Sequence, residues 1–167
     1  MRFAKKNENT EKIEPSSGVP QNYRGNGFTI NQPEEWQDET VYTLTGPIED
    51  GVKHNVLINV EQDVEVDSVA DHADRQIEAL TVQLHGCRFL KRGEIRLNNG
   101  LEAYEAVFRW YPAEEVRLYQ RQIYVLFENT AYTLTSTFTK KSRKIIGPEV
   151  DRIMMSFRPE PFPADQS

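Results

Sequence analysis

Hydrophobic and polar residues alternate along three consecutive runs of the chain, at 101–110, 116–127 and 131–138. A period of two places neighbouring side chains on opposite faces of a β-strand, so these runs predict three strands of one sheet. We assign Phe108, Ile123 and the other large apolar side chains of the runs to one face, which must be covered. The opposite face mixes amides, threonines and a few apolar groups, and we call it the mixed face.

Shorter apolar runs before this meander predict four further strands, at 28–30, 41–44, 54–62 and 88–97. The dipeptide Asn99-Gly100 favours a tight hairpin turn and joins the last of these strands to the meander. Trp36 lies in a turn after Pro33, and we expect its ring to plug an edge of the core.

The spacing of apolar residues predicts a helix over 68–84, where Ala73 and Ile77 belong to one apolar stripe. Ser68 precedes this stripe as a capping residue. A second helix is predicted over 148–157, because Pro148 suits a first helical turn. Both helices are expected to cover the apolar face of the sheet. The four basic residues before the second helix are interpreted as a solvated loop, with contact to a partner as the alternative: Lys140, Lys141, Arg143 and Lys144.

The predicted order is therefore β-β-β-α-β-β-β-β-α, and short turns between strands favour an antiparallel sheet in an α+β fold. Residues 1–26 are polar and aperiodic, so we expect a disordered tail there. Residues 27–159 are predicted to form one domain, followed by a C-terminal tail at 160–167.

Charge and hydropathy narrow the class of protein. The formal net charge of −6 disfavours nucleic acid and anionic membrane surfaces as partners. The polar N-terminus resembles no signal peptide, and no run reaches the ~18 apolar residues of a membrane span. We expect a soluble cytoplasmic protein that does not insert stably into a membrane.

Candidate chemistry is sparse. The single cysteine, Cys87, rules out an internal disulfide and a cysteine-based zinc site. The three histidines lack the spacing of metal ligands, and the chain has no nucleophile elbow or phosphate-binding loop. Carboxylates such as Glu105 lie on predicted strands and turns, and nothing in the sequence indicates that any is buried and paired. We therefore predict no catalytic residue, no metal site, no cofactor and no enzyme.

The mixed face has two interpretations. It is either the ordinary solvated face of a half-buried sheet, where Thr and Gln are common, or a concave surface that binds an apolar partner. The pattern alone favours the solvated face, and Leu57 and Tyr124 are among the large apolar groups that keep the second interpretation open. Gln76, at the border of the first helix's apolar stripe, is either a solvated rim residue or a group that reaches over the edge of a groove.

Five segments in a fixed order resemble the DcrB-related family, whose fold is PsbP-like. The segments are Phe28–Asp38, Ser68–Ile77, Phe108–Trp110, Tyr119–Tyr124 and Ser156–Phe157. Among members of that family without signal peptides, the chain is similar to the cytoplasmic Eag chaperones of type VI secretion. Those proteins form dimers and hold the N-terminal transmembrane helices of toxic effectors before export.

The resemblance implies a groove at these positions: Val41, Thr43, Asn55, Leu57, Asn59, Gln76 and Gln122. The face pattern adds Tyr124 and Thr133. We predict a homodimeric, non-enzymatic chaperone or adaptor that binds the hydrophobic N-terminal helices of a secreted effector. The alternative is a small-molecule or lipid-binding domain on the same fold.

Overall fold

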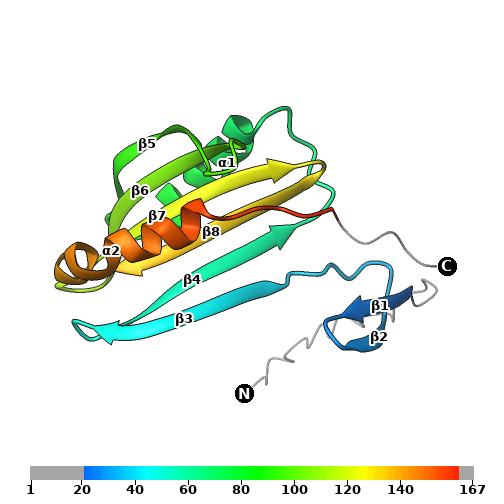
Figure 1. The fold of residues 1–167 in the computed structure, drawn as a ribbon, viewed down its shortest axis with the longest axis horizontal. Helices are drawn as coiled ribbons and strands as arrows, with labels where there is room; N and C mark the ends of the chain where they lie inside the picture. The colour runs from blue at the N-terminus through cyan, green and yellow to red at the C-terminus, as the bar shows by residue number, and fades with distance from the viewer. Residues whose placement is uncertain (1–20, 162–167) are drawn as a thin grey trace, which may run out of the picture. The chain divides into compact units, whose positions relative to one another are not determined.

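The computed structural model describes residues 21–161. Six strands form one antiparallel sheet in the order β3-β4-β8-β7-β6-β5 (Figure 1). Their bounds are β3 (Val41–Glu49), β4 (Val52–Glu61), β5 (Arg88–Arg96), β6 (Glu102–Ala113), β7 (Val116–Phe127) and β8 (Thr130–Phe138). The α+β class and the predicted order of elements are confirmed, with one additional strand at the start of the described chain.

The two helices, α1 (Val69–Gln83) and α2 (Lys140–Met155), lie on opposite faces of the sheet (Figure 1). On one face, Ile77 of α1 packs in a cluster with Phe108 and Tyr124. On the other, Met154 of α2 packs in a cluster with Ile123. The prediction that both helices cover one face is therefore wrong, and the protein has two cores separated by the sheet.

Strand register explains this error. Phe108 pairs directly with Gln120 across β6 and β7, whereas Ile123 pairs with Leu134 across β7 and β8. Directly paired residues project to the same face, so Phe108 lies on the face of Gln120, opposite Ile123. The assignment of Phe108 and Ile123 to one face is wrong, because alternation within each strand does not fix the register between strands.

Helix α1 begins and ends as its sequence predicts. The Ser68 hydroxyl caps the helix by accepting a hydrogen bond of 3.1 Å from the Asp71 backbone N–H. Gly86 follows the helix with a φ of 63°, and a Cβ at this position would lie only 2.8 Å from the Tyr111 ring. Only glycine suits both the left-handed backbone and this close contact.

Helix α2 begins two turns before the predicted start at Pro148. Thr139 caps it: the side chains of Thr139 and Ser142 each accept a hydrogen bond from the other's backbone N–H. Pro148 lies inside the helix, and the buried stripe of Ser142, Ile146, Val150 and Met154 runs through it. The predicted loop at 140–144 is therefore also wrong, because its basic residues occupy the first turns of α2.

Residues 21–38 belong to a compact unit distinct from the unit that begins at Glu39. In it, β1 (Gln21–Gly25) and β2 (Phe28–Gln32) pair as an antiparallel hairpin. Residues 21–25 are thus a strand and not part of a disordered tail, and β2 pairs with β1 instead of the main sheet. Of the tails predicted at 1–26 and 160–167, residues 1–20 and 162–167 lie outside the described residues.

Trp36 is 69% exposed, so its ring is not buried within this first unit, and its place at an edge of the sheet's core stays a prediction. Its backbone, not its ring, is held within the first unit: the Gln32 side-chain amide donates to the Trp36 carbonyl, and the Trp36 N–H donates to the Pro33 carbonyl.

Candidate functional site

The sheet brings eight of the nine predicted binding residues onto one face. One row of directly paired residues runs Val41, Asn59, Thr133 and Tyr124 from β3 to β7. The adjacent row runs Thr43, Leu57, Thr135 and Gln122. Asn55 pairs with Thr45 and continues the same face. The predicted mixed face is thus contiguous across four strands.

Helix α1 divides this face into a covered part and an open part. It packs against β6 and β7, so Tyr124 is 0% exposed and Gln122 is 9% exposed. The six remaining predicted sheet residues lie on β3, β4 and β8 and are exposed or half-buried, and we call them the open part of the mixed face: Val41, Thr43, Asn55, Leu57, Asn59 and Thr133. Gln76 on α1 is half-buried.

The covered part of the face is a packed polar pair. The Tyr124 hydroxyl donates to the Gln122 side-chain oxygen, and the His72 ring meets Tyr124 edge-on at 6.2 Å between centroids. Burial raises the pKa of Tyr124 and lowers the pKa of His72, so both side chains stay neutral at pH 7. Tyr124 and Gln122 are therefore buried between the sheet and α1, and neither side chain is accessible to a partner in this conformation.

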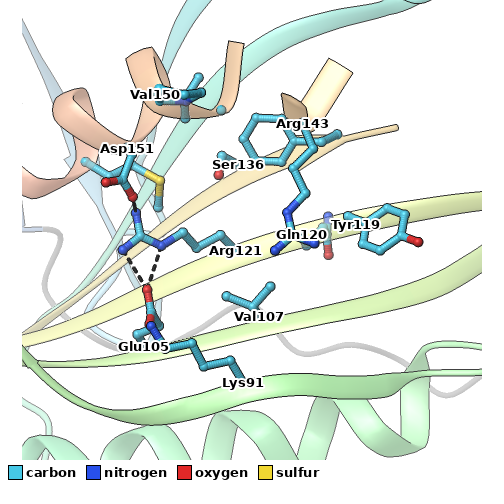
Figure 2. Close-up of a pocket in the computed structure, with 14 residues that line it drawn as sticks. Lys91, Glu105, Val107, Tyr119, Gln120, Arg121, Ser136, Arg143, Val150 and Asp151 are labelled. Atoms are coloured by element: carbon cyan, nitrogen blue, oxygen red, sulfur yellow. Dashed lines mark hydrogen bonds and ion pairs between the residues drawn. The ribbon is translucent and has the colours of Figure 1, made fainter. Parts of the chain in front are cut away.

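A charged network that no sequence pattern predicts lies on the opposite, α2 side of the sheet (Figure 2). The Glu105 side chain is only 4% exposed, and its oxygens lie 2.6 Å from both Lys91 Nζ and an Arg121 terminal nitrogen. Arg121 also pairs with Asp151 of α2. Glu105 is thus a buried and paired carboxylate, which no pattern in the sequence indicated.

Opposing effects set the pKa of Glu105. Burial alone would raise it, but hydrogen bonds from Lys91 and Arg121, together with their positive charges, outweigh burial and hold the pKa below the ordinary value of 4.5. Glu105 is therefore an anion at neutral pH, which makes it a structural ion-pair partner and unsuitable as a proton donor.

A cluster of metal ligands or a membrane-spanning helix would indicate a different kind of site. Within residues 21–161, no three His, Cys, Asp or Glu side chains gather closely enough to hold a metal ion. Neither helix of that part of the chain combines the length and the apolar character that crossing a bilayer demands.

Comparison with known proteins shows which fold this is. The structure resembles PA94, a Pseudomonas aeruginosa protein of unknown function, with a TM-score of 0.68 and 23% identity over 86% of this chain and 99% of that one. It also resembles cyanobacterial PsbP (CyanoP) from Synechocystis sp. PCC 6803, with a TM-score of 0.52 and 12% identity over 90% and 99% of the two chains. The predicted PsbP-like fold is confirmed. No curated protein sequence matches the chain.

A family model provides the closer assignment. The model of the DcrB family matches residues 28–156, which include both helices and the whole six-stranded sheet. The chain therefore belongs to the DcrB family.

Proposed function

We propose that this protein is a cytoplasmic, non-enzymatic chaperone or adaptor that holds the hydrophobic N-terminal helices of a type VI secretion effector before export. The observation that carries the proposal is the open part of the mixed face. It combines the apolar side chains of Val41 and Leu57 with the amides of Asn55 and Asn59 on a sheet surface that neither helix covers.

This composition suits a membrane helix out of its membrane. Such a helix must lose its apolar surface to a partner in water, and each Å² buried contributes about 25 cal/mol. Its serines, threonines and exposed backbone groups also need hydrogen-bond partners, as they do between helices in a bilayer. The asparagine and threonine side chains beside Leu57 supply those partners without a charge that would have to be desolvated.

The two edges of the sheet support the proposed homodimer. The β5 edge carries charged residues along its length, including Lys91 and Arg92. The β3 edge has no charged residue from Val41 to Ile48, and Tyr42 and Leu44 are 53% and 56% exposed. Charged edge strands resist pairing with another chain, whereas uncharged apolar edges promote it. We therefore place the proposed contact between two copies at β3.

Co-expression tests the client-binding role. The client is a carrier protein fused to a ~20-residue hydrophobic helix that contains serines, which is the length of a membrane span. The Leu57→Asp variant should reduce the recovered soluble client at least tenfold, because it places a charge in the centre of the open part. The matched control is Val82→Asp, at an 84% exposed position on α1, and it should hold the client as the wild type does.

Circular dichroism of both variants must show a folded protein for the comparison to count. Equal recovery of the client with Leu57→Asp and with wild type would contradict the proposal. A copurified lipid in native mass spectrometry that Leu57→Asp removes would instead favour a lipid-binding function.

A further inference from the structure

A pocket of about 540 Å³ lies on the α2 side of the sheet, the face opposite to the proposed client surface (Figure 2). Its floor includes one row of directly paired residues across four strands: Lys91, Val107, Arg121 and Ser136. Its wall is α2, from Arg143 to Met154. The volume falls within the range of roughly 300–1,000 Å³ that is typical of small-molecule sites.

The pocket carries an excess positive charge. Three cations line it, Lys91, Arg121 and Arg143, against two carboxylates, Glu105 and Asp151. Both carboxylates are bound by Arg121, and Glu105 is bound by Lys91 as well. The carboxylates are therefore satisfied within the protein, and an entering ligand meets cations that still have donors available.

Arg143 is the cation best placed to receive an anion. Its guanidinium carbon lies 5.4 Å from the centroid of the Tyr119 ring, which orients the side chain along the pocket. Within residues 21–161 it forms no ion pair with a carboxylate. A stacked, uncompensated guanidinium is well suited to bind a carboxylate or phosphate through two parallel hydrogen bonds.

The start of α2 carries more cations than anions. Its first turns hold four basic residues and its first turn no acidic one, although cations are unfavourable near the positive end of the helix dipole. The Asp50 carboxylate offsets part of this charge, since it accepts a hydrogen bond of 2.6 Å from the Thr139 hydroxyl and lies 4.0 Å from Lys141 Nζ, whereas Arg143 has no carboxylate partner among the described residues.

The pocket floor supplies a separate sign of a missing partner. Ser136 is 1% exposed, and in the described part of the chain its hydroxyl has no hydrogen-bond partner. Leaving a buried hydroxyl unpaired is costly, which favours a bound molecule with a polar atom in the pocket. Apolar side chains make up most of the remaining lining, with Val107, Phe138, Val150 and Met154 beside the polar Gln120.

We infer that this pocket binds an amphipathic monoanion, with its anionic head on Arg143 and its hydrocarbon body against Val107, Val150 and Met154. The site is separate from the proposed client surface, since the sheet lies between them, and it does not depend on the chaperone role.

Isothermal titration calorimetry with decanoate, below its micelle concentration, tests the inference on the full chain. Decanoate should bind one site per chain, whereas decanol and decyltrimethylammonium should bind at least tenfold more weakly. Arg143→Gln should weaken decanoate binding about tenfold, which corresponds to the loss of one charge-assisted contact. The matched control, Lys144→Gln, removes a neighbouring cation that does not line the pocket and should change the affinity less than twofold.

A second variant blocks the pocket without removing charge. Gly147 lines the wall, and a Cβ there would meet only the Arg143 side chain at 3.9 Å, so Gly147→Leu fits the helix and fills the space beside it. It should abolish decanoate binding. The inference would be overturned if decanol bound as tightly as decanoate. It would also be overturned if Arg143→Gln and Lys144→Gln lost the same affinity for decanoate, or if Gly147→Leu bound decanoate as the wild type does. Loss of decanoate binding in Leu57→Asp would also overturn the inference, because it would show that the ligand binds on the mixed face.

Discussion

The Glu105 carboxylate on β6 accepts a hydrogen bond of 2.8 Å from Arg121 Nε on β7, and the same guanidinium pairs with Asp151 on α2. Lys91 on β5 binds the other oxygen of Glu105. One chain of ion pairs thus links three neighbouring strands to α2, and Glu105 is its most deeply buried member.

Replacement of Glu105 by Gln should lower the free energy of unfolding by about 3 kcal/mol at pH 7, because it leaves Arg121 partly unpaired in a buried position. The folded-state pKa of Glu105 is lowered, so its contribution is present above the ordinary value of 4.5 and is lost as the pH falls through the lower folded value. Urea unfolding of both proteins between pH 8 and pH 3 should show a difference in the free energy of unfolding that is constant near neutral pH. This difference should shrink as the pH falls below 4.5. The same difference at every pH would show that the carboxylate's charge contributes nothing.

Truncation of Ile77 to Ala should destabilise the protein by about 3 kcal/mol, because it opens a cavity between α1 and the sheet. Ile77 is 4% exposed and packs with Phe108 and Tyr124. The control is Val82→Ala on the solvent side of the same helix, where the change should stay within about 0.5 kcal/mol. Thermal denaturation of the two variants makes the comparison. Similar melting temperatures for both would contradict the packing of α1 on the mixed face.

A charge on the uncharged sheet edge should separate the proposed homodimer. Leu44→Lys, on β3, should convert a dimer into a monomer when molar mass is measured by size-exclusion chromatography with light scattering. Leu90→Lys places the same charge on β5, where the wild-type side chain is 46% exposed, and should leave the dimer intact. A dimer that persists in Leu44→Lys would place the contact elsewhere, and a monomeric wild type would contradict the homodimer itself.

Local signals in the sequence predicted local structure well. The cap at Ser68 and the apolar stripe through Ile77 define α1, because capping and helical periodicity depend on residues within a few turns. The start of α2 was missed for a related reason. Pro148 suits a helix start, but the reciprocal bonds of Thr139 and Ser142 lie two turns earlier and use a serine in place of the usual Glu or Gln.

Alternation placed Leu57, Gln122 and Tyr124 on one face, and strand pairing confirms that arrangement. Features that depend on the register between distant segments could not be predicted. The burial of Tyr124 beneath α1 follows from the register of β6 against β7, which no single run of sequence contains. The charge network of Glu105 likewise joins residues from four elements that only the fold brings together.

The order of strands also determines how the chain can assemble. Strands β5 to β8 pair with their neighbours in sequence through hairpins, whereas the β4–β8 seam joins Val56 to Ser136 across α1 and the whole meander. Because closing a long loop costs more entropy than closing a hairpin, we expect the meander to assemble first and the β3–β4 hairpin to join it last. Most of the open part of the mixed face lies on that hairpin. A newly made chain would therefore complete the proposed client surface only at the final step of folding, when Asn59 comes beside Thr133.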